Sequence, residues 1–367
     1  MGGLTVEFSF SEEQQMLRDE ARAFLESKLP AERVVDLADS GAGWDPGVWK
    51  QMAELGWIGL SADSAAGGAG MTFLEEAVLF EELGRVLFPG PFFSTVGLCL
   101  PALEHSPELL ARVVEGEITL SFAWAEASGP FTLYESTGYG TKGTNEGGTW
   151  TLSGEKVLVP DAGLVSHFVV AAGTADGPGL FVAEAEGEQS PTMDSTRKLG
   201  TVRFEGVPAS LLAAPNEFGA LLERIRLRAH AGLALEAVGV GDAALVMAVD
   251  HAKTRTQFGR PIGAYQAVSH GVADSYTDVE LARSLAYWAA WCVAESESQA
   301  PAAVAGAKSF AGEAAVRACE RSIQVHGGMG FTWEHMLHRY YKRAQWIEAF
   351  DGFGPAHRSV LAERLLD

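Results

Sequence analysis

The sequence predicts an α+β protein of three domains, in which a small antiparallel β-barrel or sandwich lies between two helical domains. Length is the first observation, because 367 residues are too many for one simple core. The second is a helical period of apolar residues near both ends, and the third is a middle part of short β-branched and aromatic runs. We expect an N-terminal helical domain at residues 1–117, a β domain at 118–215 and a C-terminal four-helix bundle at 216–367.

The N-terminal domain is predicted to consist of helices joined by a glycine-rich loop. Ser11 can cap the first helix, with Gln14 at the capping-box position. Gly56 stops the second helix, and glycine in the loop that follows permits backbone angles closed to other residues. The apolar segment 88–103 is expected to be buried. The predicted helices cover residues 11–28, 46–55 and 72–87.

The middle domain is predicted from strand-like runs separated by Gly, Asp and Asn turns. No helix-length pattern interrupts these runs, which favours a small closed or sandwiched β structure. Residues 138–148 are expected to form a flexible polar turn or insertion. The predicted strands cover residues 118–124, 149–159, 167–172, 179–185 and 201–204.

The C-terminal domain is predicted from four long apolar helices, which suggest an antiparallel bundle. Three glycines in the first of them, Gly232, Gly239 and Gly241, are expected to mark close approaches between helix backbones. A cofactor loop is not expected there, because no strand precedes these glycines. The predicted helices cover residues 218–253, 266–295, 302–326 and 354–366.

Composition limits the classes of partner and compartment. The 48 acidic and 27 basic residues give a formal charge of -21, so nucleic acid and anionic membranes are not expected partners, and an anionic ligand needs a local basic pocket. The cysteines at positions 99, 292 and 319 are far apart, so neither a metal site nor a disulfide framework is expected. The chain begins without an apolar signal run or a myristoylation pattern, and no charge-free apolar run is long enough to span a bilayer. We therefore expect a cytoplasmic protein.

The stretch from Arg255 to Gln266, RTQFGRPIGAYQ, is predicted to be a helix end, a tight polar turn and the start of a second helix. Arg255 offers a planar fork of donors that suits a phosphate or pyrophosphate. Phe258 can lie against a flat ring, and Gly259 is typical of a helix stop. Taken alone, the stretch is equally consistent with an ordinary helical hairpin that carries a surface arginine.

Two segments resemble motifs of the acyl-CoA dehydrogenase family, flavoproteins that oxidise acyl-CoA thioesters. RTQFGRPIGAYQAV resembles one signature of that family, and Gln324-Val-His-Gly-Gly-Met-Gly-Phe331 resembles its Q-x-x-G-G-x-G-F segment. The resemblance runs from about Phe10 to the C-terminus. It implies FAD as cofactor, an acyl-CoA substrate, electron-transfer flavoprotein as electron acceptor, a role in β-oxidation of fatty acids or steroid side chains, and a homo- or heterotetramer. The FAD-binding residues that it implies, some of them for FAD bound mainly to a neighbouring subunit, are Arg255, Phe258, Gln266, Gln324, Gly327 and Gly328.

Asp351 is the catalytic base that the resemblance implies. Phe350-Asp351-Gly352-Phe353 stands where the family often carries Y-E-G-T, at the same spacing from Gln324. An aspartate is one methylene shorter than glutamate, and such a misplacement can cost about 100-fold in rate. Alternatively, Asp351 caps the following helix, and both roles remain open. Other family members place the base near Ala229, where this chain has no carboxylate; the adjacent His230 is not assigned a role.

Several flavin-contacting phrases of the family are altered in this chain. The T-E-P-x-A-G-S-D segment is represented by Trp124-Ala125-Glu126-Ala127, so its threonine is absent. The G-E-K-x-W-I-T/S-N segment lacks its tryptophan and its hydroxyl residue. The chain thus resembles the less complete subunit of heteromeric actinobacterial acyl-CoA dehydrogenases. Three hypotheses follow: a subunit of such a mixed complex, a self-sufficient homotetramer with Asp351 as base, or a non-catalytic acyl-CoA-binding or structural homologue.

Overall fold

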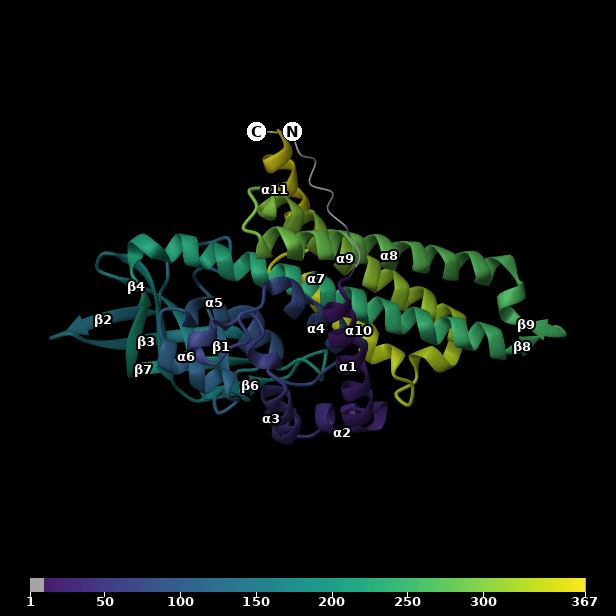
Figure 1. Ribbon diagram of the computed structural model, residues 1–367, viewed down its shortest axis with the longest axis horizontal. Coiled ribbons are helices and arrows are strands. Elements are labelled where there is room, and N and C mark those ends of the chain that lie inside the picture. Colours follow the sequence, from purple (N-terminus) through teal and green to yellow (C-terminus); the bar gives the residue numbers. More distant parts are fainter. Residues whose placement is uncertain (1–9, 367) are drawn as a thin grey trace.

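The computed structural model describes residues 10–366. The extreme N-terminus, for which no signal run was predicted, lies outside this range. Within it, the order is helices, strands and helices again, as predicted (Figure 1). The elements change from helix to strand between α6 (Pro107–Val114) and β1 (Leu120–Ala123), and from strand to helix between β7 (Leu199–Ala213) and α7 (Pro215–Thr254).

The N-terminal part contains the predicted helices and others that the pattern did not predict. Ser11 caps the first helix as expected, since its hydroxyl accepts from the backbone N–H of Gln14 at 3.1 Å. Gly56 has φ +78° beside the end of the third helix, where a left-handed residue ends helices. Helices α2 and α6 are eight or nine residues long and were not predicted. The helices are α1 (Glu12–Lys28), α2 (Ala31–Asp39), α3 (Pro46–Glu54), α4 (Phe73–Arg85), a buried π-helical segment (Phe93–Cys99), α5 (Leu100–Leu103) and α6 (Pro107–Val114).

The middle part is a closed β structure. Strands β4, β2, β3, β7 and β5 form a ring, with β1 added to β4 and β6 added to β7. The strands are β1 (Leu120–Ala123), β2 (Lys142–Glu146), β3 (Thr149–Pro160), β4 (His167–Thr174), β5 (Gly177–Glu184), β6 (Gly187–Ser190) and β7 (Leu199–Ala213).

Two details of the predicted β domain are wrong. Residues 138–148 are not merely a turn, because β2 lies within them and pairs antiparallel with β3. The sheet is also not wholly antiparallel, since β1 and β2 both pair parallel with β4. Parallel neighbours cannot be joined by a tight hairpin. The long connection 124–141 after β1 allows this arrangement, and it brings residues 130–139 toward the helical domain.

The C-terminal part is a helical bundle built on α7 (Figure 1). Helices α7, α8 and α9 run along the longest axis of the molecule, and the β domain and the β8–β9 hairpin lie at opposite ends. The sequence did not predict α10, which completes the bundle, while α11 packs on α9. The elements are α7 (Pro215–Thr254), β8 (Thr256–Gln257), β9 (Arg260–Pro261), α8 (Gln266–Ala294), α9 (Ala300–His326), α10 (Leu337–Ala349) and α11 (Gly354–Leu366).

The glycines of α7 have the packing role that was predicted. A Cβ on Gly239 would overlap the carbonyl oxygen of Glu81 in α4, and one on Gly232 would lie 3.0 Å from the Phe80 ring. A Cβ on Gly241 would lie 3.2 Å from Val279 in α8. Helix α7 is also the one described helix that is long and apolar enough to cross a membrane by length and composition, and its apolar stretch is mostly buried within the protein. The helix carries Glu236, Asp242 and Asp250, so it is not the charge-free run whose absence was expected.

Candidate functional site

The predicted site residues fall into two groups, which lie far apart along α7. His230 and Arg255 are separated by about 37 Å at the helical rise of 1.5 Å per residue. We call the group around Asp351 the inner cluster; it consists of Leu133, Tyr134, His230, Asp351 and His357. We call the other group the outer edge; it consists of Arg255, Phe258, Gln266, Gln324, Gly327 and Gly328.

Asp351 lies in the turn between α10 and α11 with φ +57°, a left-handed conformation that aspartate tolerates. The backbone N–H of Leu133 donates to its Oδ1 at 2.5 Å, and Nε2 of His230 lies 2.7 Å from Oδ2. Burial raises the pKa of the Asp351 carboxyl to about 7, although the Leu133 N–H and nearby positive groups oppose this shift. Both oxygens therefore have partners from distant parts of the chain, so the alternative role as a helix cap is not the one adopted.

Two histidines surround Asp351. Burial, then the charges of Lys308 and Arg226, hold the pKa of His230 well below its usual value, so the ring is neutral. Burial lowers the pKa of His357 to about 3. Its ring centroid lies 5.0 Å from that of His230. Its Nε2 has no hydrogen-bond partner within residues 10–366. The sequence pointed to His230 only through its place beside Ala229, and it did not point to His357.

Tyr134 fixes the segment between β1 and β2 onto this cluster. Its hydroxyl lies 3.4 Å from Nδ1 of His357. The guanidinium of Arg226 lies over its ring, 4.3 Å from the centroid. Together with the Leu133–Asp351 hydrogen bond, these contacts close the cluster on the side of the β domain. Asp351 is consequently only 9% exposed.

A buried lysine supports the turn that carries Asp351. Lys308 of α9 donates to the carbonyl oxygens of Ile347 at 2.7 Å and Glu348 at 3.4 Å, which are at the end of α10. Burial lowers the pKa of its ammonium to about 8, while the charge of Asp351 opposes this. The lysine and the aspartate thus offset each other's charge within the core.

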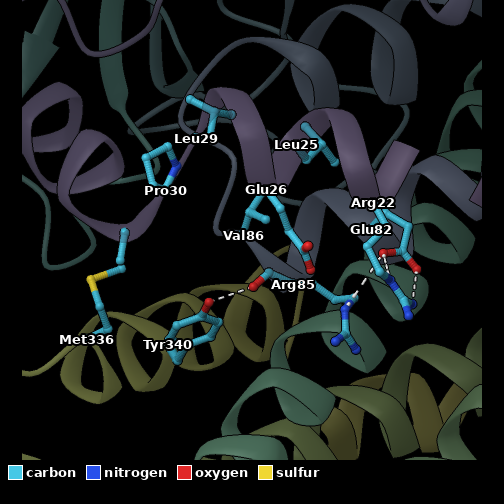
Figure 2. A pocket seen from close by; sticks show the side chains of 11 residues that line it. Arg22, Leu25, Glu26, Leu29, Pro30, Glu82, Arg85, Val86, Met336 and Tyr340 are labelled. Carbon is cyan, nitrogen blue, oxygen red and sulfur yellow. Dashed lines mark hydrogen bonds and ion pairs between the residues drawn. The ribbon is translucent and has the colours of Figure 1, made fainter. Parts of the chain in front are cut away.

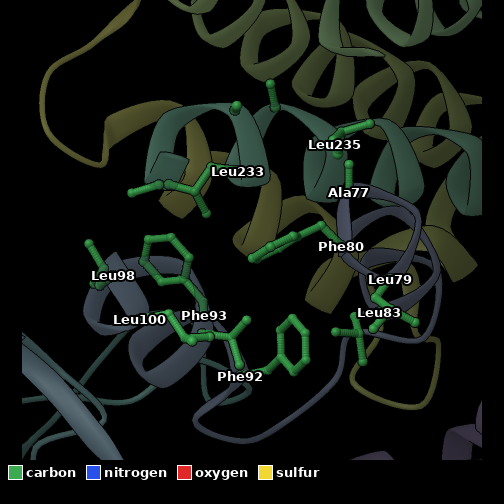
Figure 3. Close-up of a cluster of buried hydrophobic side chains, with 14 of the residues drawn as sticks. Ala77, Leu79, Phe80, Leu83, Phe92, Phe93, Leu98, Leu100, Leu233 and Leu235 are labelled. Atoms are coloured by element: carbon green, nitrogen blue, oxygen red, sulfur yellow. The ribbon is translucent and has the colours of Figure 1, made fainter. Parts of the chain in front are cut away.

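Aromatic side chains fill the space beside the inner cluster. Phe350 packs edge-on against Phe93 and Trp124, with centroid distances of 5.2 and 5.7 Å. Phe80, Phe92 and Phe93 project between α4, the π-helical segment and α7 (Figure 3). The cavity that these three rings line measures about 10 Å³, which is no more than one water molecule requires. Side chains of the N-terminal part therefore fill the space between these helices.

A larger cavity of about 220 Å³ lies between α1, α4 and α10 (Figure 2). Arg22 makes two hydrogen bonds to Glu82, at 2.7 and 2.9 Å, and Tyr340 donates to the Arg85 carbonyl oxygen at 2.5 Å. These polar groups hold the three helices together. The cavity is therefore a helix junction rather than a site with free reactive groups.

The outer edge is exposed, in contrast to the inner cluster. Arg255 is the C-cap of α7, and within the described part of the chain its guanidinium has no ion-pair partner. Phe258 has φ +50° and is 93% exposed. Gln324, Gly327 and Gly328 are exposed where α9 ends, and Gln266 is exposed at the start of α8. A Cβ on either glycine would meet open space, so a ligand can approach the backbone there.

Two histidines that sequence reasoning missed bring the two motifs of the outer edge together. His251 lies one turn before Arg255, and its ring stacks on that of His326 with centroids 4.3 Å apart. His326 lies between Gln324 and Gly327 in the sequence. The free guanidinium, the free aromatic ring and the open glycines thus share one edge, which fits the adenosine diphosphate end of FAD.

The positions that would hold the flavin ring do not fit it. Trp124 donates from its indole N–H to the Phe131 carbonyl, and the Ala125 carbonyl accepts from Val157. Glu126 accepts from Lys156 at 2.7 Å and from two backbone N–H groups of the same domain. The segment is therefore bonded to itself, and the hydroxyl donors typical of a flavin site are replaced.

Comparisons with known proteins cover both helical parts of the chain. A family model described as "Acyl-CoA dehydrogenase, N-terminal domain" matches residues 11–108, and one described as "Acyl-CoA dehydrogenase, C-terminal domain" matches residues 227–366. The acyl-CoA dehydrogenase IpdE2 of Mycolicibacterium smegmatis is 31% identical over 337 residues, which are 91% of this chain and 93% of that protein.

Solved structures agree over nearly the full length. A variant of the steroid ACAD Tcur3481-Tcur3483 superimposes with a TM-score of 0.85 at 30% identity, covering 97% of this chain and 98% of that chain. The ChsE4-ChsE5 complex of Mycobacterium tuberculosis gives a TM-score of 0.88 at 25% identity, covering 99% of each chain.

Proposed function

The chain belongs to the acyl-CoA dehydrogenase family of oxidoreductases, and we propose that it is the incomplete subunit of a mixed complex with a homologous, catalytically complete partner. In this complex the outer edge completes the partner's FAD site, and the partner provides the base. FAD bound there supplies the hydride acceptor for α,β-dehydrogenation of an acyl-CoA thioester, with electron-transfer flavoprotein as electron acceptor. The reaction class belongs to β-oxidation of fatty acids or of steroid side chains.

The observation on which this proposal rests is the closed environment of Asp351. A base that removes the Cα proton of a thioester must come within hydrogen-bond reach of it. Both oxygens of Asp351 already contact Leu133 and His230. Phe350, the residue before Asp351, packs on Phe93, and the cavity that Phe93 lines with Phe80 and Phe92 holds about 10 Å³. An acyl chain of even a few carbons does not fit this space without moving Phe80, Phe92 or Phe93.

The outer edge supports the proposal from the opposite side. Arg255 can donate two hydrogen bonds to the diphosphate, Phe258 can pack on a flat ring, and Gly327 and Gly328 leave room for the cofactor against the backbone. Arg255, at the end of α7, lies about 37 Å from His230 along that helix, so the outer edge serves a cofactor other than one beside Asp351. The similarity to a chain of the ChsE4-ChsE5 complex also favours a partner of related sequence.

A second function is favoured by one specific observation. The pKa of Asp351 is raised to about 7, which suits a general base that works near neutral pH. In this alternative the chain is a self-sufficient homotetramer, and the segment of Leu133 and Tyr134 moves away when substrate binds.

Substitution of Asp351 distinguishes the two functions. In a complex of this chain with a co-expressed homologue, Asp351→Asn and Asp351→Glu should both leave acyl-CoA turnover per folded complex within about twofold, because misplacement effects of about 100-fold arise only at the acting base. The matched control is replacement of the partner's own carboxylate base, which should abolish turnover. The chain purified alone should be colourless.

The opposite result is equally clear. The self-sufficient enzyme would be established if the chain purified alone is yellow and active. Asp351→Asn should then abolish activity with FAD still bound, and Asp351→Glu should retain or raise the activity. A colourless chain that is inert with every homologous partner would instead leave a non-catalytic acyl-CoA-binding or structural role.

A further inference from the structure

Three imidazole rings lie in a row at the outer edge; the first two are stacked and the third is tilted, and we call the row the stack. His251 comes from the end of α7, His326 is the last residue of α9, and His335 lies in the loop before α10. The centroids of His251 and His326 are 4.3 Å apart with nearly parallel planes, and those of His326 and His335 are 4.7 Å apart. Arg255 follows His251 by one helical turn, and its backbone N–H donates to the His251 carbonyl oxygen at 2.9 Å.

The hydrogen bonds of His326 determine what its ring can donate. Its Nδ1 lies 2.8 Å from the carbonyl oxygen of Ser322, which can only accept, so Nδ1 carries the proton. In the neutral ring Nε2 is then without a proton, and it becomes a donor only when the ring is cationic. A protonated ring at this place would offer an anion both a charge and an N–H group.

The groups that act on the stack are cationic or become cationic. Burial lowers the pKa of His251, and His326 and Arg255 lower it further. Burial is likewise the main cause that lowers the pKa of His335, and the nearby His326, His251 and His338 lower it further. No carboxylate is among the groups that shift these two rings. Within the described chain, no group of three metal-ligating side chains could hold a metal ion, so the rings do not converge on a cation.

We propose that the stack of His251, His326 and His335 is a further part of the diphosphate-binding edge, where His326 donates from Nε2 to a nucleotide diphosphate when protonated. This inference rests on the proposed function of the outer edge and adds a regulation to it. An anion that favours the protonated ring must, by linkage, bind more tightly as the pH falls. The stack also joins the end of α7 to the end of α9, so it holds Arg255 and the two glycines in one arrangement.

The test uses the full chain and ADP-ribose, a diphosphate diester whose charge stays constant between pH 6 and pH 8. By calorimetry, ADP-ribose should bind on the order of tenfold more tightly at pH 6 than at pH 8. A tenfold change corresponds to a coupling of about 1.4 kcal/mol between protonation and ligand binding, which is a typical size. In His326→Asn, whose amide can still donate to Ser322 but cannot become cationic, affinity at pH 8 should persist and the pH dependence should shrink to less than half. His105→Asn, an exposed histidine after α5, is the matched control and should behave as the parent chain.

Histidine resonances of the same samples provide the second measurement. The ring-proton resonances of His326 should shift when ADP-ribose is added at pH 6. Unchanged His326 resonances would overturn the proposal. So would an equal ratio of the affinities at pH 6 and pH 8 in His326→Asn and the parent chain, or the absence of binding at pH 6. The proposal would also be overturned if Arg255→Ala loses ADP-ribose binding while His326→Asn leaves the ratio of the affinities at pH 6 and pH 8 unaltered. Because these measurements need no partner and no turnover, they fail independently of the mixed-complex function.

Discussion

Asp351 and Lys308 are two buried charges that offset each other without touching. Lys308 contacts the end of α10, and Asp351 contacts Leu133 and His230, yet each favours the charged form of the other. Removal of either charge leaves the other uncompensated in the core, which is costly for a protein. This coupling gives Asp351 a structural role that does not depend on whether it ever meets a substrate.

Arg255 is the residue whose loss should most directly weaken cofactor retention. Its guanidinium has no partner in the described chain and is available for charged hydrogen bonds, which contribute about 1.5–3 kcal/mol. Arg255→Ala should therefore weaken FAD retention of the mixed complex about 10- to 150-fold. The measurement is flavin absorbance after dialysis. Arg224→Ala, which removes an exposed arginine paired with Glu104, is the control and should retain FAD. Equal flavin content in both variants would exclude Arg255 from the site.

His357 should limit stability in acid. Its pKa is about 3 in the folded chain against a usual 6.5, so the unfolded state binds an extra proton between these values. The stability it confers is present above pH 6.5 and is lost as the pH falls toward 3, by about 1.4 kcal/mol per pH unit. His357→Gln should flatten this dependence. Urea unfolding at pH 5 and pH 7.5 measures it, and an unchanged difference between the two midpoints would contradict it.

At the scale of elements, helices α4 and α7 cross through glycine contacts. A Cβ on Gly239 would overlap the Glu81 carbonyl oxygen, and a Cβ on Gly84 would overlap the Glu236 carbonyl oxygen. Gly239→Ala should therefore destabilise the protein by about 1–3 kcal/mol, as overpacking does. Gly219→Ala is a control within the same helix, where a Cβ meets open space, and should stabilise by up to about 1 kcal/mol. Thermal unfolding compares the two, and equal effects would show that the crossing tolerates a methyl group.

The connection between β1 and β2 covers Asp351, so that the inner cluster is closed. Leu133 and Tyr134 extend from the β domain to the turn after α10 and to helices α7 and α11. Three elements far apart in sequence thereby close over Asp351. If the segment around residue 134 were rich in glycine instead, it would lack the Tyr134 ring on which Arg226 and His357 pack.

For the whole molecule, the exposed outer edge predicts assembly with another subunit. Exposed aromatic residues near it include Phe258, Phe331 and Trp333, of which the last two are 73% and 74% exposed. We expect a tetramer when the homologous partner is present. Light scattering should then give a mass near that of four chains of about 39.0 kDa. A monomer at micromolar concentration that retains FAD fully would contradict this, because the outer edge would then have no second chain to serve.

Much of the fold could be predicted because it is encoded locally. The 3.6-residue period located α1, α3, α4 and the three longest helices, and the Ser11 capping box is confirmed. Short elements were missed, among them α2, α6, β2 and β6, because a few residues carry too little periodicity. Helix α10 was also missed, although with 13 residues it is as long as the predicted α4. Parallel pairing of β1 with β4 was missed for another reason: strand order depends on how chain segments pack, which alternation does not record.

The sequence by itself determined the fold class and the family, since both depend on local patterns and short motifs. The same motifs predict the cofactor-binding residues of the outer edge, which remain a prediction. Only the tertiary structure decided the surroundings of Asp351. Its partners Leu133 and His230 are 218 and 121 positions away in the chain. Phe350, the residue before Asp351, packs on Phe93 of the π-helical segment, which also contacts distant parts of the core. Such long-range contacts result from packing a whole core, so no local pattern reveals whether a carboxylate faces a substrate or a closed interior.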